Sequence, residues 1–410
     1  MTEQATEQPA VDLRAYGSAF HADPYPVYAE LRERGPVHRV ITPEGDTGWL
    51  VVGHDEVRAA LAAPTLSKDW TKSADDWVPD DEQGELVRHM LNSDAPRHTR
   101  LRRLVAKEFT PRRIEALRPR VQQLTDELLD AMAASPSGGH ADLVEALAFP
   151  LPIAVICELL GVPFMDREPF REWSNTLITP HGDAEREQAA VTAMAGYLSQ
   201  MVEHKRRAPG DDLMSALIRT TDEDGDRLSP QELTSMAFLL LVAGHETTVN
   251  LITNGVLGLL THPEQLAALR ADVTLVDNAV EEMLRWDGPV EGATARFTTQ
   301  PYEVGGTEIP GGGELVILSL AAADRDPNRY PDPNRFDIRR QAGGHVAFGH
   351  GIHFCLGAPL ARMEGQIAIR SLLNRFPDLA LDTAPSTPDW RPGLLIRGVR
   401  RLAVRWTPQG

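Results

Sequence analysis

The sequence HVAFGHGIHFCLGAPLARMEG, residues 345–365, places Cys355 among glycines, histidines and a phenylalanine. The 410-residue chain has one other cysteine, Cys157, which we expect to be a buried structural thiol rather than a disulfide partner. A zinc site that uses His350, His353 and Cys355 would lack a fourth ligand in this stretch. A nucleophilic thiol with His353 as its base and a haem thiolate are the two other interpretations.

Haem ligation explains more of this stretch than the other interpretations do. Cys355 precedes a helical pattern, so backbone N–H groups and the helix dipole would stabilise a thiolate. Gly351 and Gly357 remove side chains where a flat macrocycle must approach the backbone. Phe348 can shield the sulfur from water, and His353 can reach a haem propionate.

The composition limits the classes of partner and the location of the protein. The 41 basic and 59 acidic residues give a net charge of −18, which argues against nucleic acid and against an anionic membrane surface as partners. The N-terminus has no apolar signal-like run, and no uninterrupted apolar run reaches the ~18 residues of a membrane span. With two cysteines, the chain is expected to be cytoplasmic. We expect residues 1–20 to be a flexible arm and residues 21–410 to form a single, monomeric domain.

Helical apolar spacing dominates the chain. The longest predicted helix begins after Ser229, where Pro230 and Glu232 complete a capping box, and continues to about His262. Strand-like segments occur near both ends, at residues 49–53 and 394–406. The predicted fold class is therefore mainly α with small β-sheets. Further helices are predicted at residues 25–36, 96–109, 111–134, 147–162, 189–207, 276–286 and 355–375.

The middle of the longest helix, LLLVAGHETTVNLI (239–252), is polar between two apolar halves. A glycine such as Gly244 costs about 1 kcal/mol in a helix interior, and a buried carboxylate such as Glu246 needs partners. Thr247 can bond back to the carbonyl one turn earlier and loosen the helix. We therefore predict a distorted turn beside a ligand, for which Ala243 and Gly244 leave room. Glu246 and Thr247 form an acid–hydroxyl pair suited to proton delivery.

An acid and a base one turn apart predict a buried charge network. Glu282 and Arg285 share a helix face, and a weak surface salt bridge is the ordinary alternative. The irregular, proline-rich stretch at residues 328–340 contains Arg335, which we expect to join the pair.

Basic residues elsewhere in the chain can balance two carboxylates. His98 and Arg102 lie four residues apart on one predicted helix face, and Arg296 is a third candidate. Each alone would be an ordinary exposed basic residue, but as a set they match the charge of two haem propionates.

Together these motifs resemble the cytochrome P450 family of haem-thiolate monooxygenases. The stretch FGHGIHFCLG (348–357) is similar to the family's cysteine loop, and AGHETT (243–248) to its oxygen-activation helix. EMLR (282–285) with PNRF (333–336) is similar to the family's Glu-x-x-Arg network, and DAPRHTRLR (94–102) to the propionate-binding helix of bacterial members. The motifs occur in family order, from about residue 20 to the C-terminus.

The resemblance implies a P450 fold with haem b (iron protoporphyrin IX) between the long central helix and the cysteine-loop helix. It implies Cys355 as the iron ligand, Glu246 and Thr247 as proton donors, and O2 as a substrate. Electrons would come from NAD(P)H through a ferredoxin reductase and a ferredoxin. A basic dock for the ferredoxin is expected from Arg100, Arg103, Lys107, Arg112, Arg113, Arg339, Arg340 and Arg362. A peroxide-driven peroxygenase and a non-catalytic haem protein that binds a ligand remain as alternatives.

Within the soluble bacterial class, the chain resembles actinobacterial macrolide and polyketide hydroxylases, notably in SKDW (67–70) and PLPIAVICELLGVP (150–163). This implies hydroxylation or epoxidation of a hydrophobic natural product, a macrolide or another polyketide. Acidic residues between 75 and 85 would suit an aminosugar on the substrate, whereas Asn92 would not. By position, the substrate walls are expected to be Met90, Leu91, Leu177, Ile178, Leu239, Val242, Val290, Ala293, Thr294, Leu394, Leu395 and Ile396.

Overall fold

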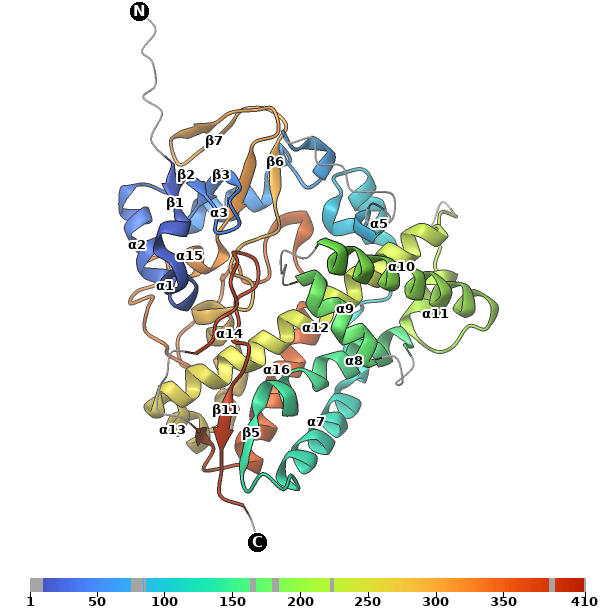
Figure 1. The fold of residues 1–410 in the computed structure, drawn as a ribbon, viewed down its shortest axis with the longest axis vertical. Helices are drawn as coiled ribbons and strands as arrows, with labels where there is room; N and C mark the ends of the chain where they lie inside the picture. The colour runs from blue at the N-terminus through green and yellow to red at the C-terminus, as the bar shows by residue number, and fades with distance from the viewer. Residues whose placement is uncertain are drawn as a thin grey trace, which may run out of the picture.

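Helix α12 (Pro230–Thr261) crosses the centre of the molecule, and the other long helices pack around it (Figure 1). Glu232 N donates to Ser229 Oγ and Ser229 N donates to Glu232 Oε2, which confirms the predicted capping box. The helix ends next to His262, as expected. Its neighbours are α8 (Pro150–Leu160), α10 (Ala184–Arg207), α14 (Val276–Asp287) and α16 (Ala358–Arg375).

The computed structural model describes residues 10–74, 84, 86–162, 167–178, 184–221, 225–382 and 388–408. Helices account for most of these residues, so the prediction of a mainly α fold with small β-sheets is confirmed. The remaining helical segments are η1 (Leu13–Tyr16), α1 (Gly17–Ala22), α2 (Tyr25–Arg34), α3 (His54–Ala62), η2 (Trp70–Lys72), η3 (Met90–Asn92), α5 (Arg97–Ala106), α6 (Pro111–Ala116), α7 (Arg118–Ala133), η4 (Val144–Ala148), α9 (Arg167–Ile178), α11 (Leu213–Arg219), α13 (Pro263–Ala271), η6 (Val273–Leu275), α15 (Leu320–Asp324) and η7 (Gly351–His353).

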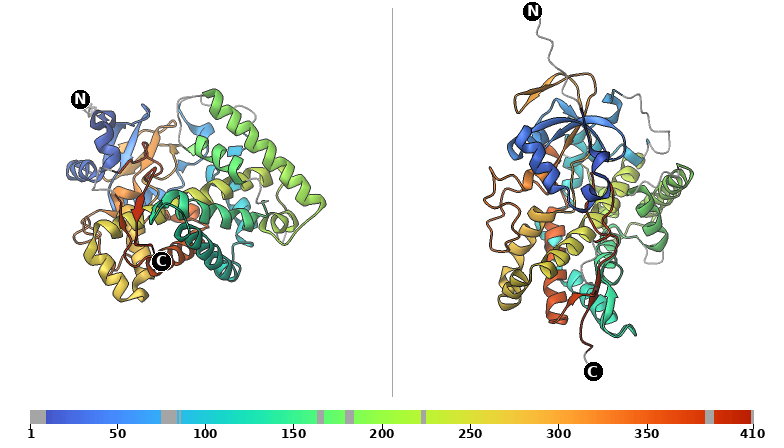
Figure 2. Two further views of the ribbon diagram at one scale, coloured as in Figure 1. Left: turned by 60° about the horizontal axis from the view of Figure 1, so that its bottom comes forward. Right: turned by 60° about the vertical axis from the view of Figure 1, so that its left-hand side comes forward.

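A six-stranded mixed sheet lies at the end of the molecule opposite the C-terminus (Figure 2). Its order is β1-β2-β3-β9-β6-β4, in which β2 is antiparallel to β3 and β3 is parallel to β9. Its strands are β1 (Val11–Asp12), β2 (Val37–Ile41), β3 (Thr47–Val51), β4 (Leu66–Ser67), β6 (Arg296–Thr298) and β9 (Leu315–Leu318). The two smaller sheets consist of β10 (Ala380–Leu381), β11 (Ala403–Arg405) and β5 (His140–Asp142), and of β7 (Tyr302–Val304) and β8 (Thr307–Ile309).

The core is one large helical cluster around α12 and two smaller clusters on the faces of the mixed sheet. Of the helices in the described residues, α12 alone has the length and apolar composition to cross a membrane. In this structure 72% of its most apolar window is buried inside the protein. A helix that fills the core of a large helical protein has the same composition, because it is covered on all sides.

The flexible arm predicted at residues 1–20 extends too far along the chain, because residues 11–20 belong to the fold. Within the described part of this segment, Val11 and Asp12 pair in parallel with Val40 and Ile41 of the mixed sheet. Leu13 and Phe20 are each 1% exposed and belong to the core cluster that also contains α2. Burial of these apolar side chains and the added strand hold residues 11–20 against the domain.

Candidate active site

Cys355 lies in the loop between η7 and α16, and α16 packs against the central helix α12. Its N–H donates to Phe348 O at 2.9 Å. Helix α16 begins at Ala358, so the helix predicted from residue 355 starts later than expected. The backbone N–H groups still act on the sulfur: burial raises the pKa of the Cys355 thiol, and hydrogen bonds from Gly357 N and Ala358 N oppose that rise.

The two glycines of the cysteine loop have different roles. A Cβ at Gly357 would lie 4.0 Å from Cys355 Sγ, so this glycine borders the sulfur. Gly351 instead has a φ of +74°, and a Cβ there would lie 3.0 Å from Ala62 Cα on α3. Its turn and its contact with α3 therefore already require a glycine, whereas room for a macrocycle at Gly351 stays a prediction.

The middle of α12 is open on one side. Ala243 is exposed and Val242 and Thr247 are half-buried, although the residues on either side of this turn belong to the core. Thr247 Oγ1 donates to Ala243 O at 2.9 Å, the back-bond that the sequence predicted. The protein therefore leaves space beside this turn, as expected for a bound group.

The predicted distortion of this turn is absent, because α12 is a continuous α-helix from Pro230 to Thr261. Gly244 also has a role that was not predicted from the sequence. A Cβ at Gly244 would lie 2.9 Å from Ile156 Cδ1, so the missing side chain allows close approach of α8, and room for a ligand there stays a prediction.

Glu246 is buried and bound at one oxygen only. Arg391 Nη1 donates to Glu246 Oε1 at 2.5 Å, and Asn250 Nδ2 lies 3.4 Å from the same oxygen. Glu246 Oε2 has no hydrogen-bond partner among the described residues; His245 Nε2 lies 3.8 Å from it. Arg391 was not predicted from the sequence, because it is distant in the chain and lies in a segment without regular structure.

Basic side chains that lack partners meet near the cysteine loop. The rings of His98 and His353 lie 4.3 Å apart, and both nitrogens of His98 are buried without a hydrogen-bond partner in the described structure. Burial lowers the pKa of His353 to about 2, together with the charges of His98, Lys68, Arg296 and Arg102. Arg296 is buried, and its Nε also has no partner among the described residues.

Lys68 is a member of this basic cluster that the sequence analysis missed. It is 2% exposed, and its Nζ donates to Thr294 O at 2.9 Å and to Ala295 O at 2.8 Å. Burial lowers its pKa well below the usual range, and the charge of Arg296 lowers it further. The buried Arg296 Nε donor and the two buried His98 nitrogens, which have no partner in the described structure, are costly unless a ligand joins them. The cluster therefore fits a ligand with two carboxylates, such as haem.

Arg102 takes a position on the cysteine side of this cluster. Its Nη2 donates to Phe354 O at 2.6 Å, directly before Cys355. Burial lowers the pKa of Arg102, whereas the negative charge of Cys355 raises it. Arg102 therefore connects the helix expected to bind propionates to the cysteine loop.

The predicted charge network exists, with a different third member. Arg285 donates to both oxygens of Glu282 at 2.7 and 2.8 Å, and both side chains are buried. Arg340 Nε lies 3.2 Å from Glu282 Oε1 and completes the network. The expectation for Arg335 is wrong, because only its carbonyl contacts Arg285 while its side chain is exposed near Asp337.

The predicted substrate walls form two groups in the structure. Val290 pairs with Ile396, and Glu291 N donates to Leu395 O at 2.9 Å, so the segments 290–293 and 394–396 lie side by side. The segment with Met90 and Leu91 meets α12, where His89 stacks on Phe238. Thr294 instead binds Lys68, and the side chains of Leu177 and Ile178 and the acidic residues 75–83 and 85 lie outside the described residues.

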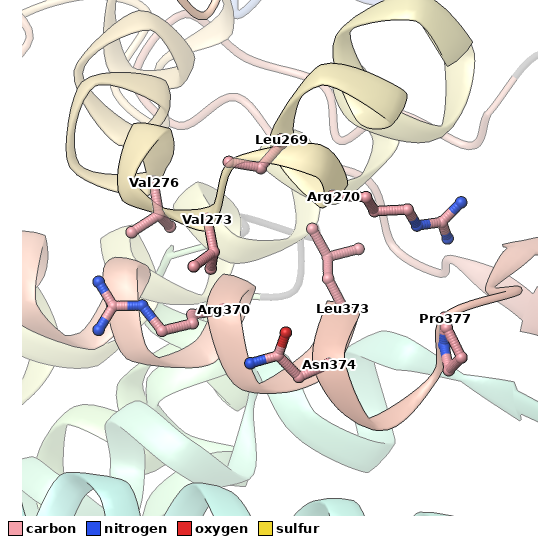
Figure 3. Close-up of a pocket in the computed structure, with 8 residues that line it drawn as sticks. All are labelled: Leu269, Arg270, Val273, Val276, Arg370, Leu373, Asn374 and Pro377. Atoms are coloured by element: carbon pink, nitrogen blue, oxygen red, sulfur yellow. The ribbon is translucent and has the colours of Figure 1, made fainter.

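The structure also contains a cavity of about 210 Å³, whose lining residues are drawn in Figure 3. It is formed by α13, η6, α14 and α16, and none of the predicted site residues lines it. The cavity is lined by Leu269, Arg270, Val273, Val276, Arg370, Leu373, Asn374 and Pro377.

The zinc interpretation of the cysteine stretch has no structural support, since no three histidine, cysteine or acidic side chains converge in the described parts of the chain.

Comparison with known proteins identifies the family. A family model described as cytochrome P450 matches residues 167–398. The cytochrome P450 monooxygenase PikC of Streptomyces venezuelae is 58% identical over 407 residues, which cover 99% of this chain and 97% of that protein. 6-Deoxyerythronolide B hydroxylase of Saccharopolyspora erythraea is 47% identical over 400 residues, which cover 94% and 97%.

Solved structures agree with this comparison. The tirandamycin C-bound P450 monooxygenase TamI superimposes with a TM-score of 0.88 at 47% identity, covering 97% of this chain and 100% of that one. Both the sequence match and the fold match extend over nearly the whole chain. The chain therefore belongs to the cytochrome P450 family and is a P450 monooxygenase, as its cysteine loop indicated.

Proposed function

We propose that this monooxygenase uses haem b to hydroxylate or epoxidise a macrolide or another polyketide. The observation that carries the proposal is the Cys355 loop next to a basic cluster in which His98 and Arg296 have buried nitrogens without a partner in the described structure. The substrate class is supported by the identity to PikC and to 6-deoxyerythronolide B hydroxylase over nearly the full chain. The paired apolar segments 290–293 and 394–396 would contact such a substrate.

Different residues of the site would bind the iron and the propionate carboxylates of haem. Cys355 Sγ would be the iron ligand, bordered by Gly357 and supported by backbone N–H groups. His98, His353 and Arg296, with Lys68 and Arg102, would hold the propionates. When bound, haem supplies the reduction and activation of O2 that amino-acid side chains cannot perform.

The protein controls protons from the middle of α12. Glu246 Oε2 has no partner in the described structure, so it is the oxygen that can take up a proton while Arg391 holds Oε1. Thr247 Oγ1, which here donates to Ala243 O, is the hydroxyl that can pass a proton to the open side of the helix. This acid and hydroxyl favour use of O2 over use of peroxide, because peroxide chemistry does not need this proton delivery.

The electron source and the location of the protein are proposed from its resemblance to soluble bacterial P450 enzymes. We propose a ferredoxin and an NAD(P)H-dependent reductase as the electron source, and a cytoplasmic location. Part of the expected dock is occupied by ion pairs, which lowers the net positive charge that a ferredoxin would meet. The arginines already bound to carboxylates are Arg100, Arg113, Arg340 and Arg362.

The absorption spectrum of the reduced, CO-bound protein tests the haem-thiolate part of the proposal. We expect the red-shifted Soret band of thiolate ligation, and its loss in Cys355→His, which keeps a metal ligand of another type. Cys157→Ser is the matched control and should keep the band, since Cys157 is a buried thiol of the helical core. A wild-type spectrum without this band would contradict the proposal.

Titration of the oxidised protein with macrolides and other polyketides then tests the substrate class. A substrate that binds beside the haem would change its absorption spectrum, so each candidate can be ranked by its dissociation constant. Turnover is measured with ferredoxin, reductase and NAD(P)H and, separately, with hydrogen peroxide. Turnover with peroxide alone would favour a peroxygenase, and binding without any turnover would favour a non-catalytic haem protein.

A further inference from the structure

The ion pair between Glu281 on α14 and Arg362 on α16 lies beside the Glu282 network but is separate from it. Arg362 Nε and Nη2 donate to Glu281 Oε1 and Oε2 at 2.6 and 2.9 Å, and His345 Nε2 lies 3.0 Å from Oε2. Burial raises the pKa of Glu281, but hydrogen bonds from His345 and Arg362 lower it more, to about 2. Glu281 is therefore an anion at any working pH, and Arg362 is held in one place by two hydrogen bonds.

Arg362 also contacts the loop that carries Cys355. Its Cζ lies 4.5 Å from the centroid of the Phe348 ring, and Phe348 O accepts the hydrogen bond from Cys355 N at 2.9 Å. The positive charge of Arg362, like that of Arg102, favours the thiolate form of Cys355. Glu281 therefore holds a cation against the residue whose backbone anchors the cysteine.

We propose that Arg362, fixed by Glu281, is a positioning residue that sets the electrostatic potential at the Cys355 thiolate and thereby the reduction potential of the haem. A positive charge near a redox centre stabilises the form with the extra electron, and a negative charge stabilises the oxidised form. The planar guanidinium suits this role, because it stacks on Phe348 and binds the carboxylate with two N–H groups at once. The inference rests on the proposed haem function but concerns electron uptake rather than the substrate.

The test measures the reduction potential of the full-length, haem-loaded protein by spectroelectrochemical titration. Arg362→Met removes the cation and should lower the potential, whereas Glu281→Gln removes the anion and should raise it. We expect the reduction equilibrium constant to change about threefold to tenfold in each case, equivalent to about 28 to 59 mV for a one-electron couple. Arg362→Lys keeps the charge and should stay closer to the wild type than Arg362→Met does.

The matched control is the exposed pair of Arg370 and Asp277, which joins the same two helices farther along α16 at 3.7 Å; Arg370 lines the cavity in Figure 3. Arg370→Met and Asp277→Asn should leave the potential unchanged. Shifts of the same sign in the Arg362→Met and Glu281→Gln variants, or an equal shift in the control, would refute the inference. A wild-type protein without the thiolate-type CO spectrum would instead refute the proposed function, so the two failures are distinguishable.

Discussion

Glu246 is a buried acid with one oxygen bound by Arg391 and the other without a partner in the described structure. An isolated buried carboxylate is costly, and the ion pair with Arg391 at one oxygen offsets that cost while the second oxygen stays available. At the scale of single residues, the chemistry of Glu246 therefore depends on Arg391. That dependence could not be seen in the AGHETT motif, because the two residues are joined only by the folded chain.

Glu291 gives a pH-dependent prediction at the same scale. It is buried and accepts a hydrogen bond from Tyr28 Oη at 2.6 Å. Burial raises its pKa from 4.5 to about 7, against the charge of Arg397 and the Tyr28 hydrogen bond. Between these two values the folded protein binds more protons than the unfolded chain, so its free energy of unfolding falls as the pH rises from about 4.5 to about 7.

Glu291→Gln should remove this part of the pH dependence, because the amide oxygen still accepts from Tyr28 but does not titrate. The free energy of unfolding of the variant minus that of the wild type should increase by up to about 3 kcal/mol between pH 5 and pH 8. Denaturant unfolding of the haem-loaded proteins at both pH values measures this difference. Parallel curves for the two proteins would contradict the prediction, and the exposed Glu308→Gln is the control.

At the scale of elements, the segment 388–399 is attached to α12 by close packing. A Cβ at Gly398 would lie 1.7 Å from Asn250 Oδ1 and 2.4 Å from its Cγ. Asn250 cannot move away freely, since its Nδ2 donates to Glu246 O at 2.8 Å. Asn254 Nδ2 adds a second attachment by donating to Arg397 O at 3.0 Å. The segment therefore keeps a fixed register along the helix.

Gly398→Ala should destabilise the protein by about 1–3 kcal/mol, the usual cost of overpacking a core. The double variant with Asn250→Ala should recover part of this loss, because it removes the clashing side chain. Gly196→Ala on α10 is the matched control: a Cβ there meets no atom within 4 Å, and the change should stabilise the helix by about 0.5–1 kcal/mol. Melting temperatures of the haem-loaded proteins measure these effects, and a Gly398→Ala protein as stable as the wild type would disprove the attachment.

Local features of the elements were predictable from the sequence and long-range pairings were not. The capping box at Ser229 and the Glu282–Arg285 pair depend on neighbours within one helical turn, and both predictions are confirmed. Arg340 rather than Arg335 completes the network, because the path of the irregular chain decides which arginine points inward. The reason for Gly244 could not be predicted either, since it requires knowing that Ile156 faces it.

At the scale of the whole molecule, one buried ionic cluster joins both ends of the chain. Tyr25 Oη and Arg397 Nε both donate to Asp287 Oδ1 at 2.5 Å. Arg397 also donates to the carbonyls of His21 and Ala22 and stacks on Trp390. The cluster connects the N-terminal helices, the end of α14 and the C-terminal segment, which are far apart in the chain (Figure 1).

Arg397→Met should destabilise the protein by about 3–5 kcal/mol, because it leaves the buried Asp287 without its cation. Adding Asp287→Asn should restore part of the stability, since the remaining charge is removed as well. Arg400→Met is the control for a general loss of charge: its pair with Asp389 is exposed and should contribute less than about 1 kcal/mol. Denaturant midpoints distinguish these cases, and equal effects of the Arg397 and Arg400 variants would contradict the role of the cluster.

The attachment of residues 388–399 to α12 has a consequence for how this protein can change its substrate. The same short segment carries the proposed substrate-wall residues 394–396, holds Glu246 through Arg391 and packs onto Asn250 through Gly398. A replacement that shifts its backbone would therefore alter the proposed substrate contacts and the position of Glu246 together. Selectivity is most easily redesigned by changing side-chain size at Leu394 and Ile396 while Arg391, Arg397 and Gly398 stay unchanged. Insertions or deletions in this segment should lower turnover without broadening the substrate range, because they would also displace Arg391 from Glu246.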